Sequence, residues 1–438
     1  MHERHNDLPW ILGLGILVAL IVGLMQTQPL FGVVLALCCA VMAIPVLTRS
    51  TTLLWLILPL VWFHHSSTGM IYSWLFFMSL LMIELLLTPT ERQNQLREHG
   101  WLLFMAGSAL VLVVALNGGR MVVIGQWIWD FGILLLYVVL TRLEHRTEAI
   151  RMFVIWLLLV MGLAGLGVVA EGILNPGIRA RGFVAKMPTG AAYNLAMFVP
   201  LALGAIRGTR LGKVAGVVAA ILFAAIFYTG SRAPFAAVIL TSMPFLMQYR
   251  LPLLAAGSAL VAGIMLGGGG LVTRVEGFQK GNVLVEASTI MRLVMWVFAI
   301  DIISAHPWTG VGVGVFRTIV ERRLPFEDML LSHPHNVLLN KMVQLGIPLA
   351  LLFFAIITGI LIRNFRLYRR LKNLSTEDSS LTLGFMLAPW PMLICGMTDS
   401  IFNGYEQPFL VWTMLALQTI WLGLMTTQYS EKVAERAR

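Results

Sequence analysis

Two histidines and an asparagine form the part of this sequence best suited to chemistry. The run Ser332-His333-Pro334-His335-Asn336 closes a polar, arginine-bearing stretch within an otherwise apolar chain. A neutral imidazole, with an ordinary pKa of about 6.5, can take a proton from a hydroxyl group at physiological pH. His335 is therefore a candidate general base and His333 a weaker one. Asn336 either orients His335 or only caps the following helix.

Arginines that could bind an anion are concentrated in a few places. Arg232 follows a Gly230-Ser231 turn between two apolar runs, Arg292 lies on an expected helix, and Arg181 and Lys186 share one loop. The planar fork of arginine grips phosphate oxygens in a bidentate manner. These cations could instead reach lipid headgroups from the ends of membrane helices.

An acidic residue stands at the end of a late apolar run, in Thr398-Asp399-Ser400. Asp399 could hold the second nitrogen of an imidazole, bind sugar hydroxyls, or serve only the structure. A carboxylate beside membrane helices needs such a reason, because charge is costly there.

We expect neither a metal nor another cofactor. No aspartate or glutamate lies within the His-Pro-His run, and the three cysteines Cys38, Cys39 and Cys395 all fall in apolar runs. The glycines of Gly310-Val311-Gly312-Val313-Gly314 are not a nucleotide loop, since no strand precedes them and no Gly-Lys-Ser/Thr follows. They predict a tight backbone turn.

The composition indicates a polytopic membrane protein. The 438 residues are 58% hydrophobic and only 12% charged, with mean hydropathy +0.83, whereas a soluble protein carries about 25% charged residues. The net charge of +10 lies mostly in loops, which indicates topology and contact with anionic lipid rather than nucleic acid.

The elements that must position these residues are membrane helices. A hydrocarbon core needs about 20 apolar residues per helix, and the sequence predicts an all-α bundle of 12–14 spans, because two of the runs are short. A further helix at 286–305, ended by His306-Pro307, would lie in the membrane interface. The expected spans are 9–26, 29–48, 52–64, 71–89, 101–117, 121–141, 152–171, 193–206, 212–229, 235–249, 251–272, 337–362, 381–398 and 408–427.

Loop charge predicts the orientation. Cytoplasmic loops carry an excess of lysine and arginine, and the cluster from Arg363 to Lys372 places both termini in the cytoplasm. We expect a transmembrane bundle at 1–272, a periplasmic helical segment with catalytic residues at 273–336, and transmembrane helices with a cytoplasmic tail at 337–438. The apolar run after Asp7 has no small-residue cleavage site, so no cleaved signal is expected.

A series of motifs resembles the O-antigen ligase family and its polymerase relatives. The motifs are Arg181-Gly182-Phe183, Gly230-Ser231-Arg232, Ser288-x3-Arg292-x3-Trp296, Ala305 to Phe316, His335-Asn336-Val337-Leu338-Leu339 and Gly346-Ile347-Pro348. The similarity covers roughly 175–350.

The resemblance implies an inverting, metal-independent glycosyltransferase of the Gram-negative inner membrane. The donor would be a glycan on undecaprenyl diphosphate and the acceptor lipid A–core, joined at the periplasmic face during lipopolysaccharide synthesis. Arg232 and Arg292 would hold the diphosphate and His335 would be the base. Arg181, Lys186, His333, Asn336 and Asp399 are the candidate substrate-binding residues.

The sequence alone is also compatible with other functions. An O-antigen polymerase or a protein O-oligosaccharyltransferase belongs to the same superfamily. A transporter of lipid-linked glycan would place ionisable groups within the membrane and show inverted repeats. A non-catalytic assembly protein would not need the His-Asn pair.

Overall fold

The computed structural model describes residues 137, 140–141, 147–182, 185, 187–248, 283–312, 314–323, 333–371, 374–402 and 406–437. All of them belong to one compact unit, His99–Thr141 with Arg146–Arg438. The spans expected before residue 137 and at 251–272 lie outside the described residues.

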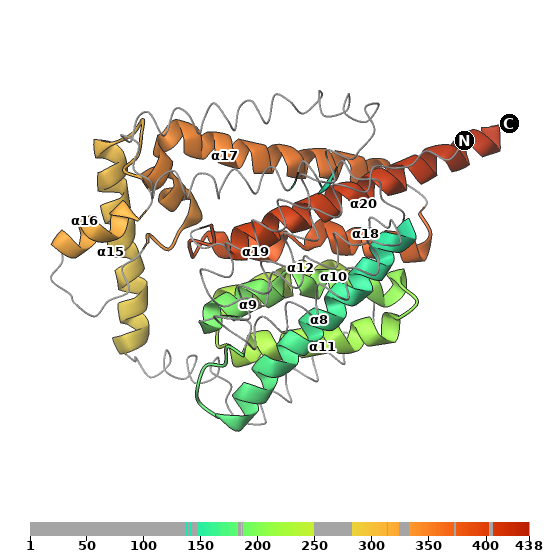
Figure 1. Cartoon of the computed structure of the whole chain (residues 1–438), viewed down its shortest axis with the longest axis horizontal. Helices are drawn as coiled ribbons and strands as arrows, with labels where there is room; N and C mark the ends of the chain where they lie inside the picture. The colour runs from blue at the N-terminus through green and yellow to red at the C-terminus, as the bar shows by residue number, and fades with distance from the viewer. Residues whose placement is uncertain are drawn as a thin grey trace, which may run out of the picture. The chain divides into compact units, whose positions relative to one another are not determined.

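Helices are the only regular secondary structure in the described part of the chain, so the predicted all-α class is confirmed, whereas the number of spans stays a prediction. In Figure 1 the long helices run side by side, and α15 stands across the end at which α17 begins. The helices are α8 (Thr147–Leu174), α9 (Pro188–Ala196), α10 (Phe198–Gly208), α11 (Gly212–Tyr228), α12 (Arg232–Gln248), α15 (Val283–Ala305), α16 (Val315–Arg323), α17 (Val337–Arg370), α18 (Thr376–Leu387), α19 (Trp390–Gly396) and α20 (Glu406–Ala437).

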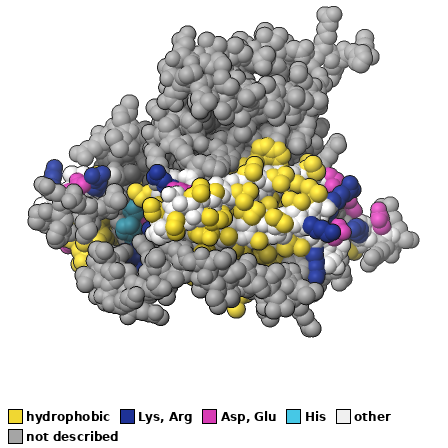
Figure 2. Space-filling model, turned by 90° about the horizontal axis from the view of Figure 1, so that it is seen from below, with side chains coloured by type: hydrophobic (Ala, Val, Ile, Leu, Met, Phe, Trp, Pro, Cys, Tyr) yellow, Lys and Arg dark blue, Asp and Glu magenta, His cyan; other side chains and the backbone are white. Residues whose placement is uncertain are grey.

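The length and the apolar composition of the helices indicate which of them can cross a membrane. Within the described residues, 5 stretches are long and apolar enough to span a bilayer, and α11 is a shorter apolar helix. Figure 2 shows the result on one face, where a broad band of hydrophobic side chains separates two charged ends. Histidine side chains appear at one of these ends. The spanning stretches are Thr147–Leu174, Pro188–Gly208, Val337–Arg370, Thr376–Gly396 and Leu410–Glu435.

Two glycines allow α10 and α18 to pack closely. A Cβ on Gly204 would stand 2.8 Å from the Cα of Gly384, and the Ser380 hydroxyl donates to the Gly204 carbonyl at 2.9 Å. Membrane helices associate through close packing at small residues, because lipid tails are as apolar as the helices and the hydrophobic effect does not drive them together. This interface joins the middle of the chain to its C-terminal third.

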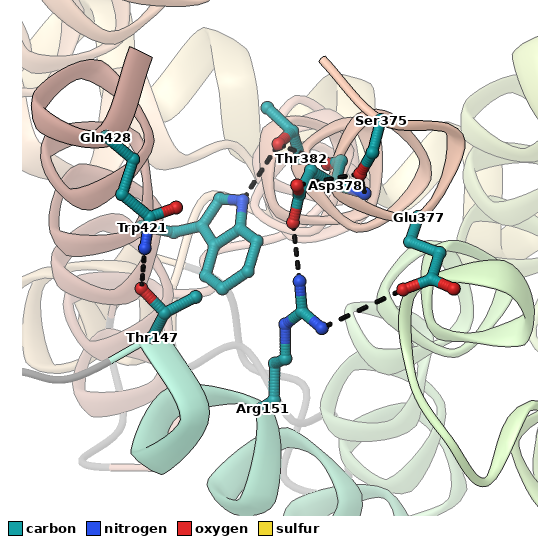
Figure 3. A network of polar contacts seen from close by, with 8 residues as sticks. All are labelled: Thr147, Arg151, Ser375, Glu377, Asp378, Thr382, Trp421 and Gln428. Carbon is teal, nitrogen blue, oxygen red and sulfur yellow. Dashed lines mark hydrogen bonds and ion pairs between the residues drawn. The ribbon is translucent and has the colours of Figure 1, made fainter. Parts of the chain in front are cut away.

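Figure 3 shows a polar network that ties three helices. It lies where α8 and α18 begin and α17 has ended, whereas the histidines precede the start of α17 at the opposite end of the bundle. Arg151 of α8 pairs with Asp378 of α18 at 2.5 Å. Gln428 of α20 donates to Thr147 at 2.7 Å. Each contact joins helices distant in sequence, so the network fixes their relative positions. We call this end the Arg151 end and the other the histidine end.

A break in α17 builds the histidine end. Gly346 has φ 76° inside the helix and Pro348 follows it. The carbonyls of Val343 and Gln344 therefore lose their helical donors, because Ile347 is turned away and Pro348 has no N–H. The glycine-rich segment replaces them: Val311 N donates to the Val343 carbonyl at 2.8 Å, Gly312 N to that of Gln344 at 3.1 Å, and Ile347 N to that of Pro307 at 2.8 Å.

These hydrogen bonds between the glycine-rich segment and α17 confirm the predicted tight turn and explain why it contains glycines. Gly310 has φ 62° and Gly312 has φ 87°, which is the left-handed region. A Cβ on Gly346 would collide with the Trp308 carbonyl oxygen. The helix before the turn ends at Ala305 as expected, and its Met295 and Ala299 pack in one buried cluster with Val343 of α17.

Replacing Gly346 by alanine tests this arrangement. We expect Gly346→Ala to lower the free energy of unfolding by more than about 2 kcal/mol, because the left-handed backbone and the Trp308 carbonyl both oppose a Cβ. Gly359→Ala is the matched control in the same helix, where a Cβ meets nothing within 4 Å. Thermal unfolding in detergent should show a clear decrease for the first variant and no decrease for the second. Equal stabilities would contradict the argument.

Candidate active site

The start of α17 is held by one side chain. Asn336 Oδ1 accepts from the backbone N–H groups of Leu338 at 2.9 Å and Leu339 at 3.1 Å, which caps the helix. Its Nδ2 donates to the Met397 carbonyl at 3.1 Å. Asn336 thus joins the histidine segment to the segment that follows α19.

Asp399 is the centre of the site. Its Oδ1 lies 3.2 Å from His333 Nε2 and 3.1 Å from His335 Nδ1. It also accepts from the Ser400 N–H at 2.8 Å, and Oδ2 accepts from the Tyr193 hydroxyl at 2.6 Å. A single carboxylate therefore joins α9, the start of α17 and the end of α19.

The hydrogen bonds set the ionisation of this carboxylate. Burial alone would raise the pKa of Asp399, but the bonds from His333, His335 and Tyr193 outweigh it and hold the pKa below the usual range of a carboxyl group. An ionised carboxylate only accepts hydrogen bonds. His335 Nδ1 therefore carries a proton, and the lone pair of the neutral ring lies on Nε2, where a base needs it.

The backbone at His335 is unusual. Its φ is 50°, the one positive value outside glycine among the described residues. The two imidazole rings lie 4.4 Å apart at an angle of 52°. A left-handed backbone costs energy in a residue with a side chain, and such conformations occur at functional sites. Here it lets two histidines separated by Pro334 reach the same carboxylate.

One arginine approaches this cluster. Arg292 of α15 is half-buried and lies within electrostatic range of the Tyr193 hydroxyl. Since Tyr193 donates directly to Asp399, the fold brings Arg292 to the histidine end. The contact of α15 with α17 near the Gly346 break accounts for this placement.

Two other predicted cations, Arg232 and Arg181, lie near the α11–α12 turn, together with Arg179. Arg232 is the exposed first residue of α12. Arg179 donates to the Thr229 carbonyl at 2.8 Å and to the Ser231 hydroxyl at 2.9 Å, so it holds the turn. The backbone N–H of Arg181 donates to Glu171 at 2.9 Å.

The order of the helices puts this turn at the histidine end, since α11 ends where α9 and α17 begin. Among the described residues, no hydrogen bond or ion pair joins Arg232 to Asp399 or the histidines. Lys186 lies outside the described residues.

Tyr193 was missed by sequence reasoning. A tyrosine in an apolar run is usually part of the core, and Tyr193 is indeed buried. Its place in α9, at the end of the bundle shared with His335, was the only available signal. The sequence had offered Asp399 as a possible partner of an imidazole, and the structure shows that it contacts both His333 and His335, which precede it by more than sixty residues.

A helical, multi-span membrane protein with an imidazole–carboxylate cluster at one end is the class that these features define. Residues 217–354 match the sequence model of the O-antigen ligase family. The chain thus carries a domain of that family, and the resemblance seen in the sequence is confirmed. No curated protein matches the chain.

The match includes Arg232, Arg292 and the two histidines, whereas Tyr193 and Asp399 fall outside it. The domain indicates a membrane enzyme of the O-antigen ligase or polymerase type in lipopolysaccharide biosynthesis.

The two roles of Asn336 can be separated experimentally. Asn336→Ala removes the cap and the bond to Met397, and we expect it to lower the free energy of unfolding by about 1 kcal/mol or more. Asn336→Ser keeps a capping oxygen and loses only the second bond. Thermal unfolding should rank wild type above serine and serine above alanine. A serine variant as unstable as the alanine variant would show that the cap contributes little.

Proposed function

We propose that this protein is an inverting glycosyltransferase that transfers O-antigen glycan from undecaprenyl diphosphate to lipid A–core at the periplasmic face. The observation that carries the proposal is the 3.1 Å contact between His335 Nδ1 and Asp399, within a chain that carries an O-antigen ligase domain. The contact orients an imidazole whose other nitrogen is free to act as a base.

The chemistry needs a base and a stabilised leaving group. His335 Nε2 takes the proton of an acceptor sugar hydroxyl while the oxygen attacks the anomeric carbon of the donor. The bond from that carbon to the diphosphate oxygen breaks, and undecaprenyl diphosphate leaves with both electrons. A single displacement of this kind inverts the anomeric centre. Asp399 stabilises the imidazolium that forms, as the carboxylate does in Ser-His-Asp triads.

Guanidinium groups would neutralise the leaving diphosphate. Arg292 is the first candidate, because it lies in electrostatic range of Tyr193, which donates to Asp399. Arg232 and Arg181 are further candidates at the same end, with Lys186 in the same loop as Arg181. His333 and Asn336 border His335 on either side, so they are candidates for contact with the acceptor.

The distribution of charge supports a periplasmic site. The Arg151 end carries the basic loop between α10 and α11 and the basic end of α17. Cytoplasmic ends of membrane helices carry such an excess. The histidine end would then face the periplasm.

Transfer by purified protein tests the base. With lipid-linked donor and lipid A–core, we expect His335→Ala to lower kcat at least about 100-fold, because general base catalysis contributes about that much. His306→Ala, at an exposed histidine after α15, is the control and should retain activity. Equal transfer by wild type and His335→Ala would remove His335 from the mechanism.

The same assay examines the donor and the acceptor. Arg292→Ala should raise the KM for donor roughly 10-fold or more, since charge-assisted bonds to phosphate are strong. Unchanged donor affinity would contradict that role. Lipid-linked O-units and a peptide serve as competing acceptors, and extension of either one would identify a polymerase or a protein oligosaccharyltransferase instead.

Tyr193 should act only through Asp399. We expect Tyr193→Phe to lower kcat about 5- to 20-fold with donor KM unchanged, because one hydrogen bond that orients the carboxylate is lost. We expect Asp399→Asn to lower kcat further than Tyr193→Phe does. If the tyrosine acts through Asp399, the double variant should be no slower than Asp399→Asn. Multiplicative losses in the double variant would give Tyr193 a separate role.

A further inference from the structure

Three metal-ligating side chains converge at the centre of the site. His333 Nε2, His335 Nδ1 and a carboxylate oxygen of Asp399 all lie within 4.8 Å of one another. The sequence run offered only two of these donors, and the fold supplies the third. Two imidazoles and one carboxylate, with a fourth position left to water, is a common set of zinc ligands.

The spacing of the donors suits zinc. The two nitrogens lie 3.2 and 3.1 Å from the same Asp399 oxygen. In a tetrahedral site with ligands about 2.05 Å from the metal, neighbouring donor atoms are roughly 3.4 Å apart. A bound ion would move each nitrogen slightly away from the Asp399 oxygen and hold the two nitrogens, which lie within 4.8 Å of each other, at about the same spacing. Binding would also remove the proton that each ring nitrogen now shares with the carboxylate.

The surrounding contacts would hold the ligands in place. Tyr193 donates to Oδ2 at 2.6 Å, which orients the carboxylate and leaves Oδ1 toward the histidines. The Asn336 bond to Met397 fixes the histidine segment against the end of α19. Outer contacts of this kind commonly change metal affinity 10- to 100-fold.

The donors are accessible and the electrostatics limit the affinity. The side chains of His333, His335 and Asp399 are 21%, 28% and 17% exposed, so an ion can reach them from water. Only one carboxylate offsets the ion's charge, and Arg292 lies nearby. We therefore expect binding in the micromolar range.

We propose that His333, His335 and Asp399 form a Zn²⁺ site. The ion takes the lone pair of His335 Nδ1, so the neutral ring must carry its proton on Nε2 and can no longer act as a base there. Zinc would then be a reversible inhibitor of transfer. The inhibition rests on the proposed function, whereas the binding does not.

Zinc binding is measured directly on the tag-free full-length protein in detergent, after treatment with EDTA and its removal. Calorimetric titration with ZnCl₂ should give one site per chain, and Mg²⁺, which prefers oxygen ligands, should give none. His333→Ala and Asp399→Asn should each weaken zinc binding at least 10-fold. His306→Ala is the matched histidine control and should bind as wild type does.

A thermal assay guards against misfolded variants. Zinc should raise the melting temperature of wild type and of His306→Ala, but not that of His333→Ala, because a ligand stabilises only the state that binds it. Absence of stoichiometric binding by wild type would overturn the site. Wild-type affinity in both His333→Ala and Asp399→Asn would do so too.

The inhibitory role has its own test. Zinc should lower transfer over the concentration range in which it binds, and EDTA should restore it. In His333→Ala, half-inhibition, relative to that variant's own metal-free rate, should need at least 10-fold more zinc. Stoichiometric zinc binding with undiminished transfer would overturn the inhibition and leave the metal site standing. An absence of transfer in metal-free protein would count against the proposed function alone.

Discussion

Backbone groups released by the break in α17 have to find partners inside an apolar bundle, where an unpaired carbonyl costs several kcal/mol. Val311 and Gly312 supply the donors, and Pro307 accepts from Ile347. These bonds dock the glycine-rich segment on α17. They thereby fix α15, which carries Arg292, relative to the start of α17, which carries His335. The glycines of the segment after α15 and Gly346 of α17 therefore support the same contact between the two helices.

Asp399 is the second constraint, and it acts through charge. A buried carboxylate is tolerated only with enough donors, and this one has donors from three separate segments. Removing any donor leaves the carboxylate less well compensated, because the remaining donors alone must stabilise its charge. The left-handed backbone of His335 is a cost that this network offsets.

The positions of many helices could be predicted from the length of the apolar runs in the sequence. The expected spans 152–171, 212–229 and 337–362 lie within or against α8, α11 and α17, and the predicted helix end at Ala305 is correct. The run 193–206 holds two helices rather than one, α9 and α10. The division into parts at 1–272, 273–336 and 337–438 stays a prediction.

The site was only half accessible from sequence. His335 and Arg292 stand out because polar groups among apolar runs are costly. Asp399 stood out for the same reason, and a contact with an imidazole was one of its expected roles. Tyr193 and the sharing of one carboxylate by both histidines do not stand out, because a contact between distant segments leaves no local pattern.

One face of α15 remains apolar and exposed, with Ile290 at 58%, Leu293 at 53% and Val297 at 67%, while the opposite face packs on α17. In the proposed orientation, the acyl region of the outer leaflet would cover that stripe, and the guanidinium of Arg292, the residue before Leu293, would lie close to the phosphates of neighbouring lipids. A polyprenyl substrate carries its diphosphate at that same depth. It would therefore reach the enzyme by lateral diffusion in two dimensions, without ever leaving the bilayer.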